Sequence, residues 1–141
     1  MDEALLAAYR ATEYRVRLSR GGHASLHIGH TPPTELIALI DGQPWSFITA
    51  WNPGSLPQPR QHNRHAQRHL LAVLRALPDA TQVRAGTGVG ADGWREPSLF
   101  VVGVRTEALD DLCLQFGQNA YVHGQSTGPA RLRLTPGTAH G

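Results

Sequence analysis

One carboxylate and its neighbours stand where the chain enters a long apolar run. Trp94, Glu96 and Ser98 alternate just before residues 99–104, which have the composition of a central strand. A glutamate at the mouth of such a strand can act as a general acid, a general base or a hydrogen-bond acceptor. Two other interpretations stay open: Glu96 in an ion pair with an arginine, and Ser98 as a hydroxyl at a strand edge.

A second group of polar residues surrounds the end of another predicted strand. Thr49, Trp51 and Asn52 stand where this strand passes into a proline-rich loop, and strand ends often carry binding sites. The alternative makes Trp51 a core anchor and Asn52 a turn residue before proline. Gln118 and Asn119 occupy a similar boundary between a helix and a strand, where capping of the helix is the alternative to a role in a site.

Asn63 is informative because helical periodicity turns it inward. Steps of about 100° per residue place it on the same helix face as the leucines at 70, 74 and 77. A buried amide without hydrogen-bond partners costs about 1–3 kcal/mol. Asn63 therefore either bonds nearby backbone or lines a polar cavity.

The same predicted helix carries three histidines on one side. His62, His65 and His69 fall within about 60° of one another around the helix axis, so their imidazoles are placed to approach one metal ion. No carboxylate or further ligand stands nearby in the sequence, and the spacing matches no metal-binding signature. We therefore predict neither a metal nor a cofactor.

Arginines occupy the helix face opposite the leucines. Arg64, Arg68 and Arg75 form either a solvated surface or a surface for an anionic protein or nucleic acid. The formal net charge of +2 and the lack of aromatic residues between the arginines disfavour nucleic acid.

A glycine-rich run at residues 86–90 has the composition of a phosphate-cradling loop. It lacks the lysine and hydroxyl residue that follow in such loops, and it leads to a strand rather than a helix. We do not predict a nucleotide-binding motif from it.

Periodicity and turn residues define the elements that must position these side chains. We expect a single α+β domain over residues 1–134, with a largely antiparallel or mixed sheet and about four helices packed against it. The C-terminal residues 135–141 are expected to form a disordered tail. The predicted helices are 3–12, 32–40, 61–77 and 106–116, and the predicted strands are 14–18, 25–28, 45–51, 81–85, 97–104, 119–123 and 130–134.

Composition restricts the compartment and the partners. The single cysteine, Cys113, excludes an internal disulfide and a cysteine-cluster zinc site, which favours a cytoplasmic location. The start of the chain lacks the pattern of a signal peptide, and no run has transmembrane length, so we expect no membrane partner. Thirteen arginines and no lysine are typical of a GC-rich genome and by themselves indicate no guanidinium-specific function.

Short motifs follow one another along most of the chain: residues 9–14 (YRATEY), residues 49–53 (TAWNP) with Ser55, Asn63 with Arg64, then Trp94, Glu96, Pro97 and Ser98, and residues 116–120 (FGQNA). In this order they resemble a bacterial family catalogued as domain of unknown function 3293. The resemblance implies no activity, but it implies that the scattered polar residues form one cavity walled by tryptophans. The candidate ligand-binding residues are Thr49, Trp51, Asn52, Asn63, Arg64, Trp94, Ser98, Gln118 and Asn119, and Glu96 is the candidate catalytic residue.

Three classes of function fit these residues. The first is a domain that binds a polar small molecule such as a nucleotide or nucleoside. The second is an enzyme that uses Glu96 as general acid or base, with amides stabilising developing charge. The third is an interaction or regulatory protein that binds an anionic partner through the arginine-rich helix.

Overall fold

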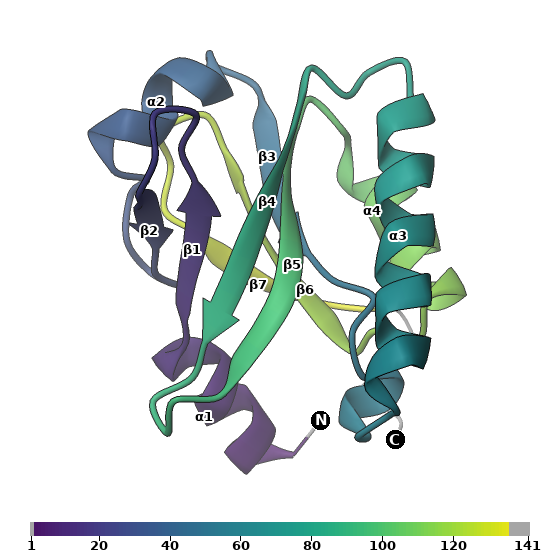
Figure 1. Ribbon diagram of the computed structural model, residues 1–141. Helices are drawn as coiled ribbons and strands as arrows, with labels where there is room; N and C mark the ends of the chain where they lie inside the picture. Colours follow the sequence, from purple (N-terminus) through teal and green to yellow (C-terminus); the bar gives the residue numbers. More distant parts are fainter. Residues whose placement is uncertain (1, 136–141) are drawn as a thin grey trace.

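Seven strands form one antiparallel sheet that curls into a half-barrel, with four α-helices around it (Figure 1). The computed structural model describes residues 2–135. The expected α+β class and the expected order of helices and strands are confirmed. The elements are α1 Glu3–Ala11, β1 Glu13–Arg17, β2 His23–Leu26, α2 Thr34–Ile40, β3 Pro44–Ile48, a 3₁₀ turn Pro53–Ser55, α3 Arg60–Ala76, β4 Gln82–Val89, β5 Arg95–Val102, α4 Thr106–Gln115, β6 Ala120–Gln125 and β7 Arg131–Leu134.

The strand order is β2-β1-β4-β5-β3-β6-β7, so β5 lies at the centre, between β4 and β3. The curl brings the two edges of the sheet together beyond β2 and before β7. There the N–H of Gly29 donates to the carbonyl of Ala130 at 2.8 Å, and the N–H of Ala130 donates to the carbonyl of His30 at 2.9 Å. These hydrogen bonds satisfy backbone groups that would otherwise stay open at the sheet edges.

Alternation along the strands creates two separate apolar cores, one on each face of the sheet. On the concave face, Trp45, Phe47 and Phe100 pack with residues of β1, β2 and α2. On the convex face, Ile48 and Leu99 pack with α3 and α4, including a fully buried Cys113. Helix α1 lies across the ends of β1 and β4, below the concave face (Figure 1).

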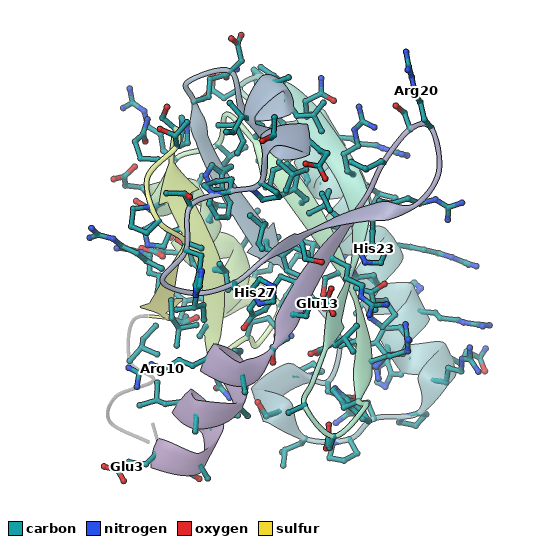
Figure 2. All side chains as sticks on the ribbon, turned by 90° about the vertical axis from the view of Figure 1, so that its left-hand side faces the viewer. Glu3, Arg10, Glu13, Arg20, His23 and His27 are labelled. Atoms are coloured by element: carbon teal, nitrogen blue, oxygen red, sulfur yellow. The ribbon has the colours of Figure 1, made fainter. Side chains whose placement is uncertain are left out.

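The β1–β2 hairpin shows how alternation sets the register. Tyr14 and Val16 face the concave core, while Glu13 and Arg15 lie on the outer side. Glu13 accepts a hydrogen bond from the Ser25 hydroxyl and lies 3.7 Å from a ring nitrogen of His23, which Figure 2 shows beside it. A slip of one residue would turn these charged groups into the core, so the pairing is strongly specified.

The boundaries of two predicted elements were wrong. Helix α2 begins at Thr34 instead of residue 32, because a residue that precedes proline disfavours the helical region and Pro32 precedes Pro33. Strand β3 ends at Ile48 rather than residue 51. Beyond it the N–H of Ala50 donates to the side chain of Gln67 in α3 at 2.9 Å, so the chain leaves the sheet there.

The glycine-rich run predicted as a connection belongs largely to strand β4. Gly86 pairs with Val16 and Ser98, and Gly88 pairs with Tyr14 and Glu96, because ladder hydrogen bonds need no side chain. A β-carbon on Gly86 would lie 2.7 Å from a Phe47 ring carbon and 2.8 Å from the carbonyl oxygen of Arg15. One on Gly88 would meet nothing closer than 3.6 Å, so only Gly86 is required for packing.

The last described residue, Thr135, is anchored to the fold. It is 4% exposed, and its hydroxyl donates to the carbonyl of Gln118 at 2.6 Å. The rest of the expected tail, residues 136–141, lies outside the described residues. Within residues 2–135, no helix combines the length and apolar character needed to cross a membrane.

Gly86→Ala should destabilise the protein by about 1–3 kcal/mol, because the added methyl group would press against Phe47 and a carbonyl held in the ladder. Gly88→Ala is the matched control on the same strand and should stay within about 0.5 kcal/mol of the wild type. Urea denaturation measures both. Equal stabilities for the two variants would contradict the close approach at Gly86.

Candidate functional site

A cavity of about 270 Å³ opens on the concave face, between α1 and the ends of β4 and β5. Gly88 and Gly90 form part of its wall, and the side chain that Gly88 lacks leaves space free, since a β-carbon there would meet nothing closer than 3.6 Å. None of the residues of α1 is fully buried, because this helix faces the cavity in place of a filled core. Six candidate residues line the cavity: Thr49, Asn52, Trp94, Glu96, Ser98 and Gln118.

Glu96 is the acidic group of this cavity. It lies on β5 opposite Gly88, so no neighbouring side chain on β4 covers it. Burial raises the pKa of its carboxyl from 4.5 to about 7. Among residues 2–135 it forms no ion pair, so the interpretation that it pairs with an arginine is not supported. A half-buried carboxyl in such surroundings is able to exchange protons near neutral pH.

The two hydroxyl residues of the candidate set are engaged in local hydrogen bonds. Ser98 is 5% exposed, and its hydroxyl donates to the carbonyl of Glu96 at 3.1 Å. The Thr49 hydroxyl donates to the carbonyl of Pro97 at 2.8 Å and accepts from the N–H of Trp51 at 3.0 Å. Thr49 thus joins the end of β3 to β5, and both side chains shape the floor of the cavity.

Asn63 lies behind Asn52 instead of in the cavity. Its side-chain oxygen accepts from the N–H of Asn52 at 2.9 Å, and its amide nitrogen donates to the side-chain oxygen of Asn52 at 2.7 Å. The same oxygen accepts from the N–H of Gln58 at 3.1 Å. Asn63 is 2% exposed and fully paired, and it holds Asn52 in a left-handed backbone conformation with φ of 47°.

The loop that follows β3 is fastened to the turn between α4 and β6. The amide nitrogen of Gln118 donates to the carbonyl of Trp51 at 3.2 Å, and the N–H of Gly54 donates to the carbonyl of Gly117 at 2.6 Å. Asn119 does not line the cavity, but its amide nitrogen donates at 3.1 Å to the hydroxyl of Ser55, which does. Gln118 therefore both positions the loop and lines the cavity, whereas Asn119 only positions the loop.

The remaining two candidates face other surfaces. Trp51 is half-buried and lines, with Asn63, a more open surface pocket, and Trp94 borders both this pocket and the cavity. Arg64 is exposed on the outer side of α3. His69 packs edge-on against Phe116, with ring centroids 5.2 Å apart. In the part of the chain that the structure describes, no three or more metal-ligating side chains gather to hold an ion.

Three tyrosines that the pattern of polar residues did not identify also line the cavity: Tyr9, Tyr14 and Tyr121. The Tyr14 hydroxyl donates to the carbonyl of Tyr9 at 2.6 Å, which ties α1 to the sheet. Burial raises the pKa of Tyr9 to about 12, and the charge of Glu96 adds to this rise while the Ser55 hydroxyl opposes it. Tyr9 and Tyr14 stand in the YRATEY motif, which was a usable signal for their position in a site.

Asn63→Ala should destabilise the protein by about 1–3 kcal/mol, because it leaves the buried N–H of Asn52 without a partner and removes one of the two donors to the Asn52 side-chain oxygen. Gln61→Ala, on the exposed side of the same helix, serves as control and should change stability by less than about 0.5 kcal/mol. Chemical denaturation gives both values. A variant as stable as the control would show that the Asn52–Asn63 pair is dispensable.

Glu96→Gln should stabilise the protein at high pH and lose this advantage at low pH. The folded state holds the carboxyl proton up to a pKa of about 7, while the unfolded chain releases it near 4.5. Ionisation therefore costs folding free energy that grows as the pH rises from about 4.5 to 7. Thermal unfolding at pH 4.5 and pH 8 measures the difference.

Glu35→Gln, at an exposed carboxyl, is the control and should show no such gain. If Glu96→Gln were no more stable than the wild type at pH 8, the carboxyl would not be desolvated.

Comparison with known proteins gives one match. The family model described as "Protein of unknown function (DUF3293)" matches residues 48–121, from the end of β3 into β6. No curated protein and no solved structure matches the chain. The matched segment includes Asn52, Glu96 and Gln118 and leaves the tyrosines of α1 and β1 outside. Because it covers more than half of the sequence, the chain belongs to the DUF3293 family of proteins of unknown function.

Proposed function

We propose that the cavity on the concave face binds a small molecule. The observation that carries this proposal is an open space of about 270 Å³ enclosed by α1 and the sheet, close to the lower end of the usual range of about 300–1,000 Å³ for such sites. Its walls are largely apolar and aromatic, and a few polar groups converge on it. That combination gives affinity through burial and orientation through hydrogen bonds.

The lining favours a nucleoside or another ligand without phosphate over a nucleotide. No arginine or histidine is among the residues that line the cavity within the described range 2–135. A phosphate group would meet the Glu96 carboxyl without a compensating cation, and such a buried like-charge contact is costly. The groups available for recognition are the amides of Asn52 and Gln118, the Glu96 carboxyl and the aromatic rings.

An enzyme is the second candidate, favoured by the pKa of Glu96. A carboxyl with a pKa of about 7 is suited to take a proton from a substrate and return it at neutral pH. The amides that line the same cavity would stabilise charge on the substrate. Chemical conversion of a bound compound would distinguish this function from simple binding.

The outer face of α3 supports a third candidate, an anionic partner. Arg60, Arg64, Arg68 and Arg75 stand on this helix, which contains no acidic residue. Arginines four residues apart repel one another on an isolated helix, and an anionic surface would relieve this repulsion. Binding through these arginines would weaken steeply with salt.

A thermal-shift panel of nucleosides, nucleotides, amino acids, divalent metals and short nucleic acids tests the principal proposal. Ligand at about 100 times its dissociation constant adds roughly 2.7 kcal/mol of stability. We expect an uncharged or cationic small molecule to raise the unfolding temperature. This rise should be lost in Gly88→Val, because the added methyl groups would occupy the cavity. Ala91→Val, in the exposed turn of the same hairpin, is the control and should retain the shift.

Two outcomes would oppose the proposal. A small-molecule shift of equal size in Gly88→Val would place the ligand elsewhere. If only nucleic acid raised the unfolding temperature, and salt abolished this effect, the arginine face of α3 would be favoured as the binding surface.

A further inference from the structure

The charge of the cavity is one-sided. Its titratable side chains are Glu96 and three tyrosines, and neither a histidine nor an arginine lines it within residues 2–135. Burial raises the pKa of Tyr9, Tyr14 and Tyr121, so these hydroxyls stay neutral at physiological pH. The only charge that the walls can present is therefore the negative charge of Glu96. Without a counter-charge this carboxylate is costly to bury.

The rings around Glu96 add a second preference for positive charge. Tyr9, Tyr14, Phe47 and Trp94 all line the cavity. The ring of Tyr14 is held in place by the hydrogen bond from its hydroxyl to α1 and by an edge-on contact with Phe47, with centroids 5.2 Å apart. Aromatic rings attract a cation that lies within about 6 Å of their faces.

Trp94 stands at the rim of the cavity with 51% of its surface exposed. The backbone on each side of it is fixed, because its N–H donates to Asp92 at 3.0 Å and its carbonyl accepts from the N–H of Gly90 at 2.7 Å. A large indole held this way exposes apolar surface that a bound molecule would cover. Trp94 is thus positioned to close over a ligand at the mouth.

Two side-chain amides that line the cavity each have one polar atom without a hydrogen-bond partner among the described residues. The side-chain oxygen of Asn52 accepts two hydrogen bonds, so its orientation is fixed, and its amide nitrogen donates to no described residue. The amide nitrogen of Gln118 donates to the carbonyls of Trp51 and Phe116, and its oxygen accepts from no described residue. The cavity therefore offers one donor and one further acceptor beside the carboxylate.

We propose that the ligand is an amine whose protonated nitrogen lies against the Glu96 carboxylate, with an apolar or aromatic body between α1 and the sheet. This inference rests on the proposed ligand-binding function and specifies the chemical class of the ligand. A protonated nitrogen supplies the missing counter-charge, and its remaining N–H groups have the Gln118 oxygen as acceptor. A hydroxyl or carbonyl elsewhere on the ligand would accept from Asn52.

Affinity for the amine rises with pH through the titration of Glu96. The carboxyl, with its pKa of about 7, is largely protonated at pH 6 and largely ionised at pH 8. The facing hydroxyls of Tyr9, Tyr14 and Tyr121 do not titrate in this window. Because only the ionised carboxyl pairs with the ammonium group, the association constant should increase about tenfold from pH 6 to pH 8.

The test compares 2-phenylethylamine with 2-phenylethanol, which share one carbon skeleton and differ in the charged nitrogen. Ligand-observed NMR titrations of the full chain at pH 8 should show at least about tenfold tighter binding of the amine, as expected for a charge-assisted contact. Glu96→Gln should remove this preference and keep the weaker binding of the alcohol. Glu35→Gln, at an exposed carboxyl, should leave both affinities unchanged.

The outcomes separate the two proposals. Equal affinity of the two probes, with both lost in Gly88→Val, would overturn the amine and leave the cavity as the binding site. A preference for the amine that persists in Glu96→Gln would also overturn the assignment to Glu96. Failure of both probes, together with failure of the nucleosides and amino acids to shift unfolding, would overturn the binding function itself.

Discussion

The missing side chains at Gly86 and Gly88 are the constraint on which the rest of this structure depends. At Gly86 the Phe47 ring and a carbonyl of β1 occupy the place of a β-carbon, so the sheet packs tightly at its centre. Two residues further along the same strand, Gly88 leaves comparable space unfilled. Helix α1 spans that space and encloses the cavity. Strand β4 thus packs closely against its neighbours at Gly86 and leaves room for the cavity at Gly88.

The polar residues divide into those that hold the site and those that face it. Asn63 supports Asn52, and Asn119 supports the loop after β3, so neither reaches the cavity. Glu96 and Gln118 do face it, and among the described residues that line it Glu96 alone carries a charge near neutral pH. Fixing a loop through buried amide pairs keeps the recognising groups in place before any ligand arrives, which reduces the entropic cost of binding.

Much of the fold follows from local patterns in the sequence. Apolar periodicity, turn residues and prolines determined the order of the elements and the α+β class, because these signals act over a few residues. Helical periodicity also identified Asn63 as buried. The start of α2 was misplaced because the prolines were assigned to the helix, although the restriction on residues before proline was available in the sequence.

Tertiary structure alone decided the strand order and the membership of the cavity. Strand pairing joins residues far apart in the chain, such as those of β1 and β4, and periodicity carries no information about partners. The glycines were assigned to a loop because their strand character comes from backbone pairing on both sides. Whether Glu96 had an arginine beside it, and whether Asn63 faced a ligand or Asn52, depended on how the sheet curls and where the loop docks. The sequence therefore determined which residues turn inward, and the curled sheet decided which of them meet, because that depends on contacts between distant segments.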